Sequence, residues 1–410
     1  MLTTLRQMFT NTFHTTAVLQ RARDAGVVQR LRGIHPADLC LAVTTCAMGD
    51  ETRSIASARR EFYSITHYMP EESSFYDRFT PELVNLLRDM FNEALASTTR
   101  EQRGALATAL QGTGIVDVEA IDGSQITLPA SAADRFPSTS EDHGGVKLTA
   151  TLSVLFQTLS SVTVTDAKTH DRKALRLARW LHDRLQLLDR GYADHRLWAS
   201  IEDRKGFFIT PLKSSTMPTI SNIRSGVGRA HLGEKLSGDL RYWQTVDADA
   251  EFTVRKRGRR TFRVVRVPVC VQLRDGSWEE TLLWFVTNLP PDKFSPEQIA
   301  TLYRFRWEVE SLFKVLKMVG RLDHLHSANP HVIHAFIYAT LLGMVLAHNV
   351  CAMMRRARPR AEPSPHRVTA LVLASLPKII EAIGSRRLSS TLSGLEQALW
   401  REGVNPVSYT

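Results

Sequence analysis

The chain has 410 residues, enough for two or three domains, and 43% of them are hydrophobic. This composition excludes a largely disordered chain. The formal net charge of +10 favours a polyanionic partner, either nucleic acid or an anionic membrane surface, although a basic protein without such a partner has the same composition.

The first 110 residues have the spacing of apolar side chains that is typical of helices. We expect helices over 37–48, 52–65 and 81–96, with Thr80 as the N-cap of the last one and Pro81 in its first turn. We interpret residues 1–110 as a helical N-terminal DNA-binding domain. A helical packing or dimerisation domain is the open alternative.

The pattern changes after Gly114. Strands are expected over 115–128, 145–156 and 160–166, then a helix over 173–185, a short apolar strand over 185–189, a helix over 194–203 and a strand over 207–212. This order predicts an α/β fold with a mixed sheet. The sheet region, 111–212, is followed by an all-β insertion over 213–290. Helical patterns return in 291–350 and in the C-terminal region, 351–410.

The apolar run 335–353 carries His348 and Asn349 and has helical periodicity. We interpret it as a buried core helix and expect no membrane contact. The four cysteines form no C-x-x-C pair and have no zinc-site spacing, which is typical of reduced core residues in a cytoplasmic protein. They are Cys40, Cys46, Cys270 and Cys351.

Two aspartates stand at the ends of expected strands. Asp122 lies in V-D-V-E-A-I-D-G-S, and Asp189 lies in L-Q-L-L-D-R-G-Y. Carboxylates at the ends of adjacent strands can converge on one crevice, and oxygen ligands on rigid elements suit a hard divalent cation. Taken singly, an Asp at such a junction is more often a turn former.

A third acid lies on a helix that we expect over 296–318. At about 100° per residue, one face of this helix carries a phenol, an acid and several cations within about 40° of one line. These residues are Tyr303, Arg306, Glu310 and Lys317, and Lys314 joins them. The acid can bind a metal while the cations and the phenol contact phosphate oxygens. The alternative is a solvated face on which Arg306 and Glu310 form an ordinary i,i+4 pair.

The spacing Y-x2-R-x3-E-x6-K, from Tyr303 to Lys317, resembles the signature of the IS4 family of bacterial insertion-sequence transposases. The run E-S-S-F-Y-D-R-F-T at 72–80 also resembles chains of this family. The resemblance covers roughly residues 70–350. It implies an RNase H-like catalytic core interrupted by the β-rich insertion, and a catalytic, metal-binding triad of Asp122, Asp189 and Glu310.

The resemblance also implies a function. Such a DNA transposase would bind the terminal inverted repeats of its element as double-stranded DNA, cut there, in many members through a DNA hairpin, and join the ends to target DNA. Two Mg²⁺ ions about 3.5–4 Å apart would be held by the triad, and Mn²⁺ can substitute. A homodimer on paired ends, at the nucleoid in the bacterial cytoplasm, is expected. Two alternatives are a catalytically silent DNA-binding protein derived from a transposase and an RNase H-like nuclease without strand transfer.

Two further features of the insertion are candidates for DNA contact. One is a basic hairpin turn, for which a solvated turn is the alternative; it comprises Arg255, Lys256, Arg257, Arg259 and Arg260. The other is Trp284, in L-L-W-F-V-T-N-L-P on the last strand before the catalytic helix, which could stack on a flipped base. Core packing is the alternative for Trp284, because a one-residue shift would turn the side chain to the other face.

Overall fold

The structure is a computed structural model that describes residues 1–28, 33–49, 53–98, 104–140, 142–169, 181–213, 215–226, 232–233, 235–236, 245–272, 277–318, 325–359, 361–383 and 385–405.

Helices fill the N-terminal region. They are α1 (Leu2–Phe13), α2 (Thr15–Asp24), α3 (Pro36–Met48), α4 (Ile55–Thr66), α5 (Glu72–Tyr76), α6 (Pro81–Ala96) and α7 (Gly104–Leu110). The expected helices over 37–48, 52–65 and 81–96 are confirmed as α3, α4 and α6. The predicted start of α6 is also confirmed, because the Leu83 N–H donates to the Thr80 hydroxyl at 3.4 Å and Pro81 occupies the first turn.

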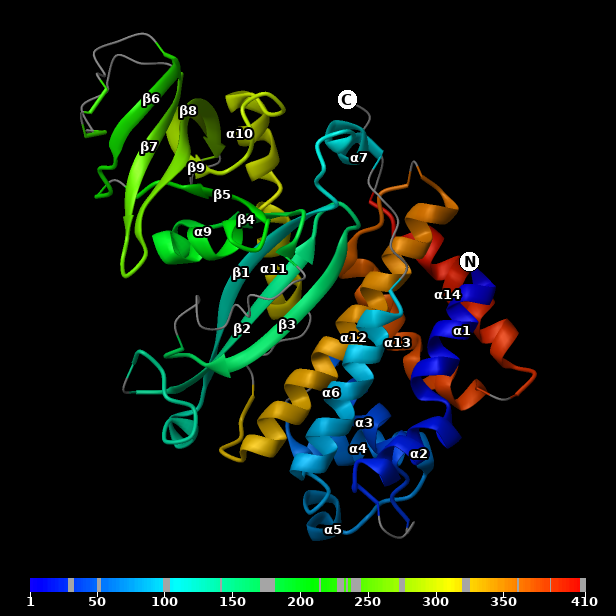
Figure 1. Cartoon of the computed structure of the whole chain (residues 1–410). Coiled ribbons are helices and arrows are strands. Elements are labelled where there is room, and N and C mark those ends of the chain that lie inside the picture. The colour runs from blue at the N-terminus through cyan, green and yellow to red at the C-terminus, as the bar shows by residue number, and fades with distance from the viewer. Residues whose placement is uncertain are drawn as a thin grey trace.

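A mixed sheet forms the centre of the fold (Figure 1). Its strands are β1 (Asp117–Leu128), β2 (Gly144–Ser153), β3 (Thr158–Asp166), β4 (Arg184–Leu188), β5 (Phe207–Pro211), β6 (Thr219–Ser225), β7 (Val246–Val254), β8 (Gly258–Gln272) and β9 (Trp278–Thr287), in the order β3-β2-β1-β4-β5-β9-β8-β7-β6. β4 pairs parallel with β1 and β5, and the other neighbours are antiparallel. The predicted mixed α/β, RNase H-like class is confirmed.

The connections of the sheet include α9 (His195–Glu202), as expected, and short 3-10 turns η1 (Ala130–Ala132) and η3 (Arg190–Tyr192). The helix expected over 173–185 falls mainly on 170–180, which lie outside the described residues. The described end of this helix is wrong, because residues 181–183 form a turn and Arg184 belongs to β4. The strand expected over 185–189 is confirmed for residues 185–188, which lie in β4.

The β-rich insertion continues the same sheet. Strand β9 returns from it and pairs with β5 from Ile209↔Thr287 to Pro211↔Phe285. Side chains strengthen this short ladder: the Thr287 hydroxyl donates to the Phe208 carbonyl at 2.6 Å. The insertion is therefore attached to the core through both backbone and side-chain hydrogen bonds.

A buried arginine ties the insertion to the segment that follows it. The Nε and Nη2 atoms of Arg263 donate to the two carboxylate oxygens of Asp247 at 2.8 and 2.7 Å. Its Nη1 donates to the backbone carbonyls of Phe294 at 2.9 Å and Leu289 at 3.3 Å. Asp247 also pairs with Arg224 at 3.3 Å. These bonds fix the start of the next helix relative to strands β7 and β8.

Helices return after the insertion as α10 (Pro296–Arg304), α11 (Trp307–Met318), α12 (Pro330–Ala357), α13 (Pro365–Ala382) and α14 (Leu388–Glu402). The single helix expected over 296–318 is wrong in one respect, because it is broken between α10 and α11. The N–H groups of Phe305, Arg306, Glu308 and Val309 bond to carbonyls three residues earlier, so the chain tightens into a turn there.

Helix α12 is the axis of the helical layer. By length and composition it could cross a membrane, but 78% of its most apolar 18-residue window is buried inside the protein. Helices α3, α6 and α13 pack around it, so the N-terminal and C-terminal regions share one core (Figure 1). The predicted core helix is confirmed. Cys40, Cys46 and Cys351 are buried, and the side chain of Cys270 lies outside the described part of the chain.

The two faces of the sheet have separate hydrophobic cores, because successive residues of a strand point to opposite faces. The larger core contains Ala120 and Leu187 and joins the sheet to the helical layer and to α10 and α11. The smaller core contains Ile121 and Leu188 and is built around Trp198 of α9. Ala120 and Leu187 therefore point to one face of the sheet, and the residues that follow them, Ile121 and Leu188, point to the other face.

Candidate active site

Asp122 and Asp189 lie at the same level on neighbouring strands. The parallel ladder of β1 and β4 ends at the pair Ile121↔Leu188, and the two aspartates are the next residue on each chain. Neighbouring strands are about 4.8 Å apart. Alternation from Ile121 and Leu188 directs both carboxylates to the face of the larger core. The two aspartates therefore lie side by side, but the strand-to-turn junction expected at Asp122 is wrong, because β1 continues past Gly123 to Leu128.

The turn after β4 holds the Asp189 carboxylate. Its Oδ1 accepts hydrogen bonds from the N–H groups of Gly191 at 2.7 Å and Tyr192 at 3.3 Å, and so caps η3. A Cβ atom at position 191 would lie 3.0 Å from Asp189 Oδ1. Glycine therefore leaves room for the carboxylate beside the turn.

Glu310 is brought to this face by α11, which packs across β1 and β2 (Figure 1). Val309 and Phe313 are buried in the larger core and anchor the helix. Glu310 itself is half-buried, and its Oε1 forms an ion pair with Nη2 of Arg306 at 2.6 Å. The third acid therefore faces the strands that carry the two aspartates.

The three carboxylates influence one another electrostatically. The pKa of Asp122 is raised to about 6, mainly by burial and also by the negative charges of Asp189 and Glu310. The Gly123 N–H and the Arg306 guanidinium act in the opposite direction and lower this pKa. A cluster of carboxylates with this mutual repulsion is stabilised by a bound cation.

Tyr303 and Arg306 complete the surroundings of the acids. The Arg306 guanidinium lies 5.7 Å from the centre of the Tyr303 ring, and the residue as a whole is 8% exposed. Burial raises the pKa of the Tyr303 phenol to about 12, so its hydroxyl stays protonated and can donate a hydrogen bond. Tyr303 lies on α10 and Arg306 in the turn before α11, so the predicted side-by-side placement results from the turn and not from one continuous helix.

The donor chemistry of this cluster fits a hard divalent cation, because three carboxylates offer oxygen ligands from rigid elements. Within the described ranges, however, no group of three acidic, histidine or cysteine residues is already placed to hold a metal ion. Glu310 Oε1 forms an ion pair with Arg306, and Asp189 Oδ1 accepts hydrogen bonds from the η3 turn. A metal ion would therefore bind carboxylates that already have partners.

The other residues predicted to contact DNA lie on α11 and in the basic hairpin, and they differ in exposure and pairing. Lys314 is exposed on α11, and the side chain of Lys317 lies outside the described part of the chain. In the basic hairpin, Arg257 and Arg260 pair with Asp203 at 3.0 Å, and Arg259 pairs with Glu251 at 3.1 Å. Arg255 and Lys256 are exposed and form no ion pair with any described residue.

The structure places Trp284 on the far face of the sheet. Its ring packs against the smaller core, with the Arg266 guanidinium 5.6 Å from the ring centre. Its neighbour Phe285 points to the opposite face and contacts Tyr303, with ring centres 4.9 Å apart. Trp284 is thus turned away from the face that carries the acids.

Two exposed residues beside the acids are absent from the sequence-based set. Trp307 is 56% exposed, lies one helical turn before Glu310 and has the Arg306 guanidinium 5.4 Å from its ring centre. Arg190 is exposed, directly follows Asp189 and is close enough to Tyr303 to influence its ionisation. Each directly follows a predicted site residue, Arg190 after Asp189 and Trp307 after Arg306. This adjacency in sequence is the signal that could have identified them.

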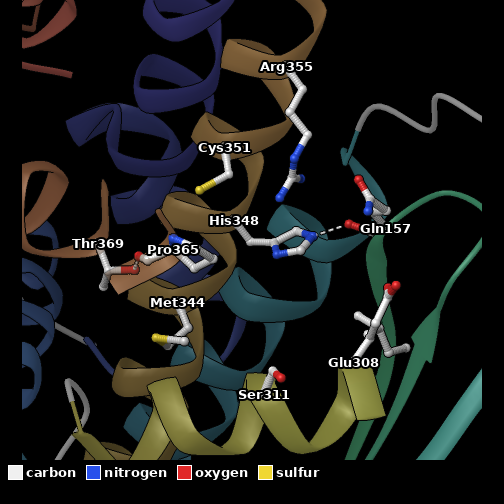
Figure 2. Close-up of a pocket in the computed structure, with 10 residues that line it drawn as sticks. Gln157, Glu308, Ser311, Met344, His348, Cys351, Arg355, Pro365 and Thr369 are labelled. Atoms are coloured by element: carbon white, nitrogen blue, oxygen red, sulfur yellow. Dashed lines mark hydrogen bonds between the residues drawn. The ribbon is translucent and has the colours of Figure 1, made fainter. Parts of the chain in front are cut away.

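A separate cavity of about 230 Å³ lies behind α11 (Figure 2). Glu308 and Ser311 of α11 line it, together with His348 and Cys351 of α12. The His348 Nε2 bonds to the Gln157 carbonyl, and burial lowers the pKa of this imidazole. No triad residue lines the cavity, and Glu308 is about half a turn around the helix from Glu310, so the cavity is outside the acidic site.

Residues 117–346, more than half of the chain, match the protein family described as Transposase DDE domain. The chain is similar to the transposase for insertion sequence element IS421 of Escherichia coli, with 38% identity over 19% of this chain and 21% of that protein. It is also similar to a protein of Sinorhizobium fredii named as transposase y4zB, with 24% identity over 48% of this chain and 51% of that protein.

A third relative, the transposase for insertion sequence element IS231F of Bacillus thuringiensis, is 24% identical over 29% of this chain and 26% of that protein. The chain thus matches only 21%, 51% and 26% of the lengths of these three relatives. The family match includes Asp122, Asp189 and Glu310, and the relatives are named after insertion sequences. The chain therefore belongs to the DDE transposase domain family, and its IS4-type identification from the Tyr-Arg-Glu-Lys spacing is confirmed.

Proposed function

We propose that this protein is an insertion-sequence transposase that binds the DNA ends of its element, cuts them and joins them to target DNA. The observation that carries the proposal is the placement of Asp122 and Asp189 in register on β1 and β4, with Glu310 facing them from α11. Inverted-repeat duplex DNA and target DNA would be its substrates. A homodimer on paired ends, acting at the bacterial nucleoid, belongs to the same proposal.

Membership of this family implies the use of a divalent metal. We propose two Mg²⁺ ions, with Mn²⁺ as a substitute, held by Asp122, Asp189 and Glu310. Bound metal of this kind supplies Lewis-acid stabilisation of the attacking and leaving oxygens at phosphorus. The protein itself orients the phosphate: the Tyr303 hydroxyl donates a hydrogen bond, and Arg306, Lys314, Lys317 and Arg190 supply positive charge.

The direct test uses a duplex with the inverted repeats that flank the gene, incubated with the purified protein in Mg²⁺ or in EDTA. We expect nicking at the repeat and joined product in Mg²⁺ only. Binding without cleavage would favour a catalytically silent DNA-binding protein. Cleavage without joining would favour an RNase H-like nuclease.

We also propose a separate role for each part of the chain. Residues 111–212 and 291–350 would form the catalytic core, 213–290 the insertion, and 1–110 a region that binds DNA. Because 1–110 and 351–410 share the core around α12, these two regions would act as one helical unit.

The basic hairpin is expected to contribute DNA affinity mainly through Arg255 and Lys256, which are exposed and form no ion pair with a described residue. Replacing Arg255 and Lys256 together with Gln should reduce the slope of log affinity against log salt by about 1.8, since each phosphate contact contributes about 0.9. Fluorescence anisotropy of a labelled duplex over a salt series measures this slope. Arg257→Gln is the matched control, because Asp203 already pairs with that guanidinium; an equal change of slope in the control would contradict the assignment.

Base stacking is expected at Trp307 and not at Trp284. Trp307→Ala should slow hairpin formation or joining on pre-nicked ends by roughly 5- to 150-fold, because stacking contributes about 1–3 kcal/mol per base. The exposed ring beside Glu310 is the physical reason. The measurement is single-turnover kinetics on pre-nicked duplexes.

Trp284→Ala is the matched control for this prediction. Its ring packs against the smaller core, so we expect a lower melting temperature and no selective block after nicking. A selective block in Trp284→Ala, with normal hairpin formation or joining in Trp307→Ala, would return the stacking role to Trp284.

A further inference from the structure

The side chain of Arg306 lies beside the acidic cluster, paired with Glu310 and close enough to act on the charge of Asp122. Its Nη2 binds Glu310 Oε1 at 2.6 Å, and its guanidinium lies between the rings of Tyr303 and Trp307, 5.7 and 5.4 Å from their centres. Its Nε is buried and has no hydrogen-bond partner among the described residues. Arg306 is thus held by the Glu310 carboxylate and by a hydrogen bond to the Tyr303 side chain, and its Nε keeps donor capacity for a further anion.

The ion pair is in competition with a metal ion for Glu310. A divalent cation would draw on the same carboxylate, and the fixed positive charge of Arg306 also acts on Asp122. Two positive groups cannot share one small carboxylate cluster without mutual repulsion. With Arg306 in place, the described residues offer no ready three-ligand metal site.

A DNA phosphate can relieve this competition. A guanidinium binds phosphate through two parallel hydrogen bonds, so phosphate is a good replacement for the single contact to Glu310. Arg306 lies in the turn between α10 and α11, where its backbone is not part of either helix. Its side chain can therefore change partner without unwinding α11.

We propose that Arg306 is a gate for the metal site, which holds Glu310 until a phosphate of bound DNA takes the guanidinium and leaves the carboxylate free for the metal. The inference rests on the proposed function and adds its regulation: DNA binding and metal binding favour each other. Free protein would then carry a weak metal site, and cleavage would be restricted to protein already seated on DNA.

The test measures Mn²⁺ binding to DNA-free protein by the loss of the electron paramagnetic resonance signal of the free ion. Arg306→Ala should bind Mn²⁺ about tenfold more tightly than the wild type, within the range usual for coupled sites. Arg306→Gln keeps the size and polarity of the side chain without its charge, and should behave in the same way if Arg306→Ala does not fold. Arg304→Ala is the matched control, since it removes an exposed arginine two residues away.

The reciprocal arm measures the affinity for a 3′-dideoxy pre-cleaved duplex, which cannot be joined, by anisotropy with and without Mn²⁺. Mn²⁺ should tighten wild-type and Arg304→Ala binding by about tenfold and should have little effect on Arg306→Ala, because coupling between two ligands is reciprocal. Equal Mn²⁺ affinities of DNA-free wild type and Arg306→Ala would overturn the gate. Mn²⁺ binding that survives in Glu310→Gln would instead refute the triad assignment, so the two failures are distinguishable.

Discussion

An Asp122→Asn variant is expected to lose at least about a thousandfold in its rate of DNA strand cleavage and to keep its affinity for the element end. The same result is expected for Asp189→Asn and Glu310→Gln. Stabilisation of transition-state charge at such a site contributes several kcal/mol, and about 4 kcal/mol corresponds to a thousandfold in rate. The measurement is single-turnover nicking of an end duplex in Mg²⁺, with end binding followed by anisotropy.

Two controls separate a chemical effect from a folding effect. Asp134→Asn removes an exposed carboxylate after η1, outside the site, and should cleave normally. Neutralising Asp122 removes repulsion with Asp189 and Glu310, so its variant should melt at the same or a higher temperature than the wild type. Nicking at the wild-type rate by any of the three triad variants would disprove the assignment.

The largest effect on stability is expected from Asp247→Ala. This change leaves the buried guanidinium of Arg263 without its bidentate partner, and breaking a buried ion pair in this way costs about 3–5 kcal/mol. The bonds from Arg263 to the carbonyls of Leu289 and Phe294 should weaken as well, which would loosen the start of α10. Differential scanning calorimetry should show a clearly lower melting temperature.

Asp249→Ala is the matched control, because it removes the same charge from the same strand. Asp249 pairs only with the half-buried Arg224 among ion pairs of the described residues, and such partly exposed pairs contribute about 0–1 kcal/mol. The melting temperature should therefore change little. Similar losses in both variants would show that Arg263 does not depend on Asp247.

The elements that the sequence predicted well are those determined by local chemistry. Helix α6 has an apolar stripe and a Thr80-Pro81 start, and its predicted bounds match the structure. The break between α10 and α11 was missed because no Gly or Pro marks it, and the periodicity around Arg306 is compatible with an unbroken helix. The pairing of β5 with β9 joins residues nearly 80 positions apart, which no local pattern determines.

In the candidate active site, too, residues marked by a local sequence pattern could be predicted, and contacts made by the tertiary fold could not. A strand-end pattern could identify Asp189, which follows β4, and the spacing to Tyr303 and Lys317 could identify Glu310. The strand end expected at Asp122 is wrong, because β1 continues to Leu128. The ion-pair partner of the hairpin arginines could not be predicted from the sequence. Asp203 follows α9 and comes close to Arg257 and Arg260 only in the folded protein. The face of Trp284 depends on strand register, so one residue decides whether an indole faces the acids or the smaller core.

The continuation of one sheet from β3 to β6 has a geometric consequence for the direction in which its strands face. Each strand is rotated against its neighbour by roughly 20–25°, so the eight steps across nine strands amount to roughly half a turn. The strands β1 and β4, which carry the two aspartates, and the strands β7 and β8, which carry the basic hairpin, therefore run in clearly different directions although they belong to one sheet.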